Sequence, residues 1–323
     1  MDGNRNRTLL VYSALVLTVI GGLIYLGQPV INQPWTARDW VAAAAIGDKA
    51  YVIGGQDRRQ GLLDEVLEVD ISRRTLRVVA RLPDPCCCLA SVAMNGRVYV
   101  LGGQGQKGYR DEVLEVDPST RKVRKIAFLP SPRTYGAAAA VSGKLYYLGG
   151  WDGEKRLDDI VEIDPATGST SVVNRLPSPR EFLTVVANDE RIYALGGEDT
   201  DGYLLDEVIE YDPGQGKIES IGRLPSPRSR ATAVAVAGDL FMIGGWEGKP
   251  LDEILQVQLD SPISSQVICH LPEPAADRSA VTIEEKIYLF GGTDPDFNRQ
   301  IATWEIDPES TKCQNIRLRR PLL

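Results

Sequence analysis

The chain has 323 residues, of which 43% are hydrophobic and 25% are charged, a composition that provides enough apolar material for a globular core. Its formal net charge of −8 argues against nucleic acid as a partner, because an acidic protein repels phosphate groups. The single histidine, His270, argues against metal sites and catalytic mechanisms that need several histidines.

The first element is an apolar run from Thr8 to Leu26 that contains no charged residue over 19 positions. A helix of this length spans the roughly 30 Å of hydrocarbon in a bilayer. We predict an uncleaved transmembrane helix, a signal-anchor, at 8–26, between a tail at 1–7 and a linker at 27–36. A cleaved signal peptide is the alternative, but such peptides have a shorter apolar region and a small-x-small cleavage site, which this run lacks.

The charges beside this run predict its orientation. Arg5 and Arg7 precede it, and no Lys or Arg follows until Arg38. The positive-inside rule then places a short N-terminal tail in the cytoplasm and exports the rest of the chain. We predict a single-pass membrane protein whose main domain is extracytoplasmic. The only N-glycosylation sequon begins at Asn6, in the cytoplasmic tail, which favours the periplasm of a bacterium.

The rest of the chain is dominated by internal repetition. A Gly-Gly pair ends a short apolar run six times, at intervals of 47 or 48 residues, and an aromatic residue stands three positions before each pair. The pairs are Gly54-Gly55, Gly102-Gly103, Gly149-Gly150, Gly196-Gly197, Gly244-Gly245 and Gly291-Gly292. Such a period indicates stacked units, none of which buries both of its faces without a neighbour.

Each unit is predicted to contain four short strands. The first is rich in small residues, as at 42–45, and the second runs into the Gly-Gly pair. The third alternates apolar and polar residues, as at 63–70, and the fourth follows a turn such as that at 117–120. Four strands per unit in six units are typical of a propeller. We therefore predict an all-β fold in which residues 37–323 form a six-bladed β-propeller. The sequence requires no strand exchange between the first and last units, and an added edge from residues 28–36 stays open.

These motifs resemble the kelch repeat. The resemblance rests on the apolar run with its Gly-Gly pair, the Leu-Asp-Glu that follows, and the Leu-Pro-x-Pro-Arg linker, and it extends over about residues 37–323. Kelch units usually carry a Tyr in the third strand and a Trp in the fourth, and this chain keeps that Tyr only at Tyr211. The resemblance implies a kelch-type propeller but no particular subfamily.

Four units place an arginine sixteen residues before the first Gly of the pair. These ring arginines are Arg38, Arg133, Arg180 and Arg228; units 2 and 6 have Cys86 and Ala275 instead. They would form either a cationic ring for an anionic ligand or structural ion pairs with the acidic residues that open the third strand. We favour the structural interpretation, because a buried charge persists only with its partner. Unit 6 has lost both the arginine and the acidic pair.

Two residues after the arginine, the chain enters the first strand at the mouth of the channel, where the resemblance implies a ligand-facing position. The six units hold different residues there: Trp40, Cys88, Tyr135, Phe182, Arg230 and Asp277. Variety within a repetitive scaffold is typical of a binding site, although packing would also permit it. The residue after the Gly-Gly pair varies too and includes two tryptophans, which favour recognition when exposed. We predict a binding surface, the top face, made of Trp40, Tyr135, Phe182, Arg230, Asp277, Trp151 and Trp246.

Two features suggest a metal site, which we do not favour. An acidic residue follows the varied loop position in five units, but such residues usually bond to their own backbone in turns. The three cysteines at 86–88 are adjacent rather than spaced as metal ligands are, and Cys269 and Cys313 fall on outer strands of other units. We predict no metal and no cofactor. A disulfide between adjacent cysteines and free thiols both stay open.

The predicted function is a membrane-anchored binding module whose top face recognises a protein or a carbohydrate. The alternative is a sugar-modifying enzyme, since propellers of the kelch type include a copper galactose oxidase and a bacterial sialic acid mutarotase. The copper chemistry needs two histidines, and the chain has one. The mutarotase needs only convergent polar groups, which Arg230, Arg278, Asp277 and Glu181 would supply. No spacing specifies a reaction, so we assign no catalytic residue.

Overall fold

The computed structural model describes residues 37–260, 262–300 and 302–318. These residues form 29 strands and no helix. No part of these three ranges lies in a helix long and apolar enough to cross a membrane. The tail, transmembrane helix and linker that we expect at 1–36 lie outside the described residues.

Each repeat unit forms a four-stranded antiparallel sheet whose strands follow one another in chain order. Units 1 and 2 contain β2 (Ala42–Ile46), β3 (Lys49–Ile53), β5 (Glu65–Asp70) and β6 (Thr75–Arg81), then β8 (Ala90–Met94), β9 (Arg97–Leu101), β12 (Glu112–Asp117) and β13 (Lys122–Phe128). Units 3 and 4 contain β14 (Ala137–Val141), β15 (Lys144–Leu148), β16 (Asp159–Ile163) and β17 (Thr170–Arg175), then β18 (Thr184–Asn188), β19 (Arg191–Leu195), β20 (Glu207–Asp212) and β21 (Lys217–Arg223). Units 5 and 6 contain β22 (Thr232–Val236), β23 (Asp239–Ile243), β24 (Glu253–Gln258) and β25 (Ser264–His270), then β26 (Ser279–Ile283), β27 (Lys286–Phe290), β28 (Thr303–Asp307) and β29 (Lys312–Ile316).

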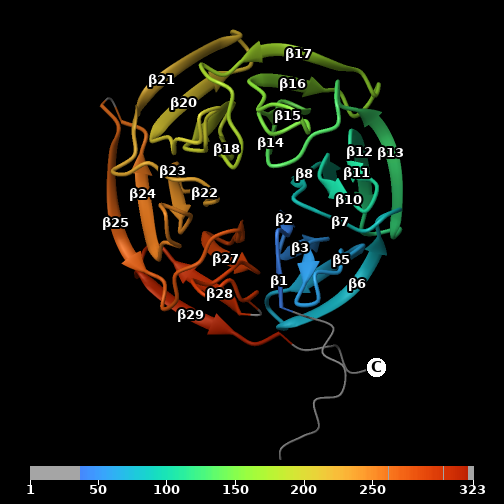
Figure 1. Cartoon of the computed structure of the whole chain (residues 1–323). Coiled ribbons are helices and arrows are strands. Elements are labelled where there is room, and N and C mark those ends of the chain that lie inside the picture. The colour runs from blue at the N-terminus through green and yellow to red at the C-terminus, as the bar shows by residue number, and fades with distance from the viewer. Residues whose placement is uncertain (1–36, 261, 301, 319–323) are drawn as a thin grey trace, which may run out of the picture. The chain divides into compact units, whose positions relative to one another are not determined.

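The sheets stand around a common axis, with the first strand of each unit innermost (Figure 1). Strands β2, β8, β14, β18, β22 and β26 contact one another in this order, and β26 contacts β2. This arrangement confirms the all-β propeller expected from the repeat. Small residues suit the first strands, such as the alanines of β2 and β14, because six strands crowd around one axis.

The hydrophobic core lies between neighbouring sheets rather than in one central mass. One cluster, for example, joins Ile53 and Val66 of unit 1 to Val100 and Leu114 of unit 2. Each of the six pairs of neighbouring units has such a cluster, including unit 6 with unit 1. Both faces of each sheet are therefore covered by a neighbour. A fully buried aliphatic side chain contributes about 1.5–3 kcal/mol, so closure of the ring is strongly favoured.

The Gly-Gly pairs recur because they are the point where one unit abuts the next. Gly196 has a φ of +61°, and a Cβ atom there would collide with the carbonyl oxygen of Arg228 in unit 5. The next amide, that of Gly197, donates to the same carbonyl over 2.9 Å. Glycine alone accepts both the left-handed backbone and the close approach.

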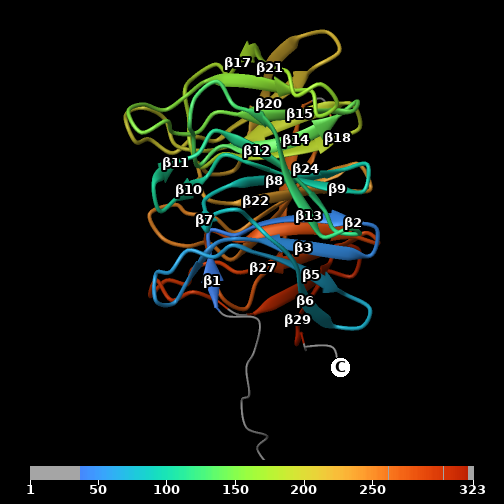
Figure 2. The ribbon, with the colours of Figure 1, turned by 90° about the vertical axis from the view of Figure 1, so that its right-hand side faces the viewer.

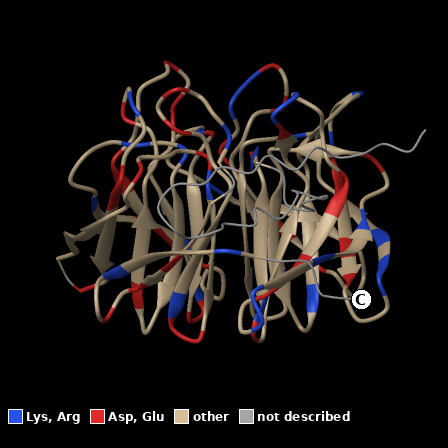
Figure 3. Ribbon diagram, turned by 90° about the horizontal axis from the view of Figure 1, so that it is seen from below, with Lys and Arg blue, Asp and Glu red and all other residues tan. Residues whose placement is uncertain are grey.

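The loops after the Gly-Gly pairs lie beside the segments that enter the first strands. Five short strands mark this in units 1 and 2: β1 (Arg38–Asp39), β4 (Gln56–Asp57), β7 (Cys86–Cys87), β10 (Gln104–Gly105) and β11 (Gly108–Tyr109). Antiparallel bridges make the same junction in the other units, for example Thr134 with Trp151. In Figure 2, β1, β7, β10 and β11 lie on one side of the ring, which is the top face. Acidic and basic residues are mixed in the loops at both ends of the sheets (Figure 3).

Candidate functional site

The four ring arginines are buried, and each contacts the acidic residue that opens the third strand of its own unit. The Nη2 atoms lie 3.1 Å from Glu65 for Arg38, 3.6 Å from Asp159 for Arg133, 2.8 Å from Glu207 for Arg180 and 2.9 Å from Glu253 for Arg228. Burial lowers the pKa of Arg38, and the charge of Glu65 opposes that shift. This geometry supports the structural interpretation over a cationic ligand site.

Units 2 and 6 lack the ring arginine, and they differ in the arginine contacts that take its place. Unit 2 keeps its acidic pair, and the side chain of Arg110 contacts both Glu112 and Asp84. The only sequence feature that indicates these contacts is an arginine directly before the acidic pair. In unit 6, Arg278 is buried against Gly292, and its guanidinium has no hydrogen-bond partner among the described residues. Burial lowers the pKa of Arg278 to about 10, and the charge of Glu273 opposes the shift.

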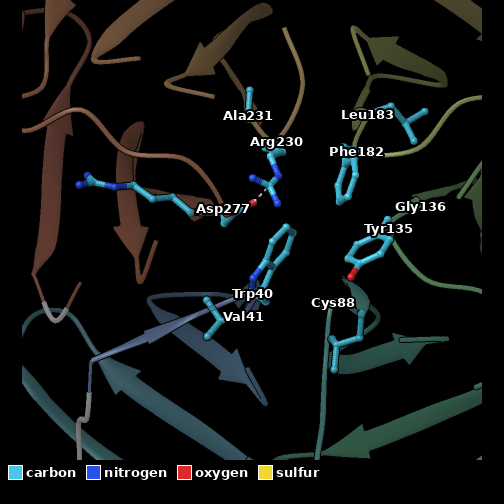
Figure 4. Close-up of a pocket in the computed structure, with 12 residues that line it drawn as sticks. Trp40, Val41, Cys88, Tyr135, Gly136, Phe182, Leu183, Arg230, Ala231 and Asp277 are labelled. Carbon is cyan, nitrogen blue, oxygen red and sulfur yellow. Dashed lines mark ion pairs between the residues drawn. The ribbon is translucent and has the colours of Figure 1, made fainter. Parts of the chain in front are cut away.

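The six varied positions have an unusual backbone in common. The φ angles of Trp40, Cys88, Tyr135, Phe182, Arg230 and Asp277 all lie between 53° and 58°. From Cys88 onward, each amide donates to the carbonyl of the corresponding residue in the preceding unit, over 2.8–3.4 Å. Left-handed backbone at a bulky residue costs on the order of 1 kcal/mol or more and gathers at functional sites. Here it turns the labelled aromatic side chains and Arg230 toward one another at the mouth of the channel (Figure 4).

Three aromatic rings and one guanidinium form the centre of the site. The ring centroids of Tyr135 and Phe182 are 4.4 Å apart, and Trp40 lies 5.5 Å from the first and 5.8 Å from the second. The guanidinium carbon of Arg230 lies 4.7 Å from the Trp40 ring centroid and 5.1 Å from that of Phe182. Cation–π contacts of this kind hold a guanidinium in place while leaving its donors free for a ligand. The cavity that these residues line has a volume of about 110 Å³.

Asp277 gives this cavity a buried acid. Its side chain is 4% exposed, and Oδ1 lies 3.5 Å from Nε of Arg230 without a hydrogen bond among the described residues. Burial raises the pKa of Asp277 to about 7; the charge of Arg230 lowers it, and that of Asp39 adds to the rise. The site therefore contains a carboxyl group that changes charge near neutral pH.

Two other acids beside the cavity are already paired across units. Asp39 accepts from Nε of Arg299 at 2.7 Å, and Arg156 lies 2.8 Å from Glu181. Burial raises the pKa of Glu181, while the charge of Arg156 lowers it. Of the four polar residues considered for an enzyme, Arg230, Asp277 and Arg278 line the central cavity and Glu181 does not. Arg230 and Asp277 also form an ion pair with each other.

Trp151 and Trp246, the predicted tryptophans that follow Gly-Gly pairs, lie outside the central cavity. Trp246 adjoins it, with its ring centroid 5.9 Å from the guanidinium of Arg230. Trp151 is not among the residues that line the cavity and bridges to Thr134 and Arg156 instead. The other five predicted binding residues line the cavity together with Cys88.

Three exposed aromatic residues that were not predicted lie on the same set of loops. Tyr203 is 70% exposed, Phe297 67% and Tyr109 37%, and Phe297 lies 6.1 Å from the Trp246 ring. We call these three residues the rim aromatics. No pattern in the chain distinguishes them from buried tyrosines, because their exposure depends on how each loop leaves its sheet.

A second cavity opens beside the first on units 1 and 2. It has a volume of about 390 Å³ and shares Trp40, Cys88 and Tyr135 with the central one. Four glutamines also line it: Gln56, Gln60, Gln104 and Gln106. Amide side chains both donate and accept, so this wall suits hydroxyl groups or peptide bonds. Gln56 and Gln104 hold the varied position after a Gly-Gly pair, whereas no sequence pattern marks Gln60 and Gln106.

The adjacent cysteines are buried thiols at the edge of the two cavities. Sγ of Cys87 and Sγ of Cys88 are 3.0 Å apart. Burial raises the pKa of Cys86 to about 12 and also raises that of Cys88, so these two thiols keep their protons at neutral pH. In the described part of the chain, no group of three or more His, Cys, Asp or Glu side chains is placed to hold a metal ion. The carboxylates of acidic loop residues such as Asp57 and Asp199 accept from backbone amides two and four positions later in the same loop, as expected of turns.

Comparison with known proteins gives one family and one solved fold. A family model described as the KLHDC2/KLHL20/DRC7 Kelch-repeats domain matches residues 40–245. A solved structure of YjhT matches with a TM-score of 0.75 over 87% of this chain and 99% of that one, at 17% sequence identity, so it is evidence of the fold alone. No curated protein matches the chain in sequence.

Proposed function

The chain belongs to the kelch-repeat family, and from that premise we propose that it is a binding module whose top face recognises a protein or a carbohydrate. The observation that carries the proposal is the mouth of the channel. Six units repeat one backbone conformation there, yet present six different side chains. In a repeat protein, positions that pack in the same way in every unit recur, whereas positions that contact a ligand are free to differ. The varied side chains at this end of the sheets therefore support it as the site of specificity.

The size and exposure of the site favour a ligand larger than a single small molecule. A central cavity of about 110 Å³ admits one side chain or one small group, whereas sites for whole small molecules usually measure about 300–1,000 Å³. The rim aromatics stand beyond it, and exposed aromatic residues near a cavity are typical of protein recognition. We favour a protein that inserts one anionic or polar group beside Arg230. The glutamine-lined cavity beside Trp40 keeps a carbohydrate as the second candidate.

An enzyme that modifies sugars is the alternative function. The observation that favours it is the contact between Arg230 and Asp277, an acid that changes charge near neutral pH in a cavity lined by aromatic rings. Nothing in the site specifies a reaction. We therefore assign no catalytic residue.

We propose that the propeller has six blades and is held to a membrane by the segment at 8–26, with the propeller outside the cytoplasm. The support is the charge-free run, the arginines before it, and repeat units that fill residues 37–323. Protease added to bacterial spheroplasts that express the full chain should digest the propeller. Full protection, with digestion only after the membrane is opened, would overturn this orientation.

Site-specific cross-linking tests which face binds the ligand. We expect a photoreactive benzoylphenylalanine at Tyr203, on the top face, to capture a discrete species in native membranes. The same residue at Thr120, in the turn between β12 and β13 at the other end of the sheets, should capture none. Digestion of the captured species with a protease or with glycosidases then distinguishes a protein from a carbohydrate.

Substitutions in the cross-linking background test the named residues. Arg230→Ala and Trp151→Ala should each weaken capture at Tyr203 by at least about tenfold, because aromatic and arginine side chains dominate binding energy. Lys144→Ala and Asp117→Ala, at the opposite end, should leave capture unchanged. A different result would contradict the proposed site: Asp117→Ala abolishes capture from Thr120, and Arg230→Ala leaves capture unchanged. Binding would then lie on the face opposite the top face.

A further inference from the structure

Cys269 and Cys313 come together although 44 positions separate them in the chain. Cys269 lies on β25 and Cys313 on β29, the outermost strands of units 5 and 6. Their sulfur atoms are 3.4 Å apart, and both residues are free thiols in this structure. Both side chains pack against the apolar cluster between the two sheets, which includes Leu271 and Trp304.

The strand register explains why these positions meet. Cys269 pairs with Ile254 on β24, and Cys313 pairs with Ile306 on β28. The corresponding positions of units 1 and 2 hold Ala80 and Val123, which belong to one shared cluster. The outer strands of neighbouring units thus approach each other at this point of the repeat. Among the described residues, only the boundary between units 5 and 6 holds two cysteines there.

We propose that Cys269 and Cys313 are the site of a disulfide that links units 5 and 6. Bond formation requires the sulfur atoms to close from 3.4 Å to about 2.05 Å. Rotation of two side chains that already face each other provides this movement, because cysteine torsions have three accessible wells. The proposal rests on this geometry and does not depend on the proposed ligand or on the location of the protein.

The reaction is thiol–disulfide exchange with a donor disulfide, such as oxidised glutathione. The thiolate of Cys313 attacks one donor sulfur, which releases the first donor thiolate and forms a mixed disulfide. The thiolate of Cys269 then attacks Sγ of Cys313 and releases the second donor thiolate. The two cysteines lose two protons and two electrons, and the donor is reduced to two thiols.

The disulfide would fix the outermost strand of the last unit to its neighbour. Strand β29 is the outermost strand of unit 6 and pairs only with β28 among the described strands. A covalent link to β25 prevents this strand from fraying. It also closes a long loop in the unfolded chain, which lowers the conformational entropy of the unfolded state and so stabilises the folded one. Oxidised protein should therefore melt about 5–10 °C above reduced protein.

The experiment uses the full chain, purified in detergent. Samples are equilibrated in glutathione redox buffers, blocked with N-ethylmaleimide, digested without reduction and analysed by mass spectrometry. We expect a linked peptide pair that contains Cys269 and Cys313, and its loss in reducing buffer. Recovery of both residues alkylated and unlinked in oxidising buffer would overturn the proposal, whatever the ligand or topology experiments show.

Matched variants assign the thermal effect to this pair. Cys269→Ser and Cys313→Ser should each abolish the difference in melting temperature between oxidised and reduced samples. Cys87→Ser, which removes the other close sulfur contact, should keep that difference. A difference that follows Cys87 instead would place the redox-sensitive link at the adjacent cysteines. The peptide map of the unaltered chain decides the question even where a variant folds poorly.

Discussion

Arg180→Ala should lower the free energy of unfolding by about 3–5 kcal/mol, toward the lower end because Glu207 is 24% exposed. The guanidinium of Arg180 is fully buried, with Nη2 2.8 Å from both Glu207 and Oγ of Ser178. Its removal leaves a partly buried carboxylate without a partner and a cavity beside the Gly-Gly junction. Urea denaturation of the full chain in detergent, followed by tryptophan fluorescence, measures the loss.

Arg191→Ala is the matched control in the same unit. Arg191 also pairs with a glutamate of β20, Glu210, but its side chain is 48% exposed. An exposed ion pair contributes about 1 kcal/mol or less, so this variant should be nearly as stable as the unaltered chain.

The loss of unfolding free energy in Arg133→Ala should lie between those of Arg180→Ala and Arg191→Ala. The contact of Arg133 with Asp159 is longer, at 3.6 Å, and Asp159 is shared with Arg175. An Arg180→Ala protein that melts normally but loses top-face capture would contradict the structural interpretation.

Asp277→Asn should stabilise the protein at pH 8 by up to a few kcal/mol and leave it nearly unchanged at pH 4. Burial raises the pKa of Asp277 to about 7, so between about pH 4 and 7 the folded state holds a proton that the unfolded state has lost. The free energy of unfolding therefore falls as pH rises through this window. Asparagine is neutral at every pH and removes that slope. Melting temperatures of the two proteins, measured from pH 4 to 8, give the difference directly.

Asp201→Asn, in an exposed loop, controls for the general effect of losing a negative charge and should change stability little at any pH. Comparison within each pH also cancels the titration of Glu181, which is shared by both proteins. A stabilisation by Asp277→Asn that is the same at pH 4 and pH 8 would show that Asp277 titrates like an ordinary carboxyl group.

The fold could be predicted from the sequence because the strands of every unit make the same kinds of local contact. The Gly-Gly pair, the aromatic residue three positions before it and the alternation of the third strand each depend on contacts within a unit or with its nearest neighbour. Such contacts recur at one period, so the period is visible in the chain. The pairing of the ring arginines with the acidic residues of the third strand followed from the same logic, and the distances at Arg38, Arg180 and Arg228 agree with it.

The candidate site was predictable in its position but not in its composition. Residues that vary within the repeat are visible in the sequence, and five of the seven that we selected line one cavity. That Trp151 lies outside this cavity, and that Tyr203 and Phe297 are exposed, depends on the path of each loop. Loop paths are irregular and leave no period in the chain.

The sequence by itself determined the repeat and its strands, because these follow from hydrophobic alternation and glycine spacing. Tertiary structure alone decided which residues of different units meet. Asp277 of unit 6 faces Arg230 of unit 5, and Cys313 of unit 6 reaches Cys269 of unit 5. Each of these contacts joins residues that do not recur in the repeat, so their proximity arises only when the sheets close into a ring.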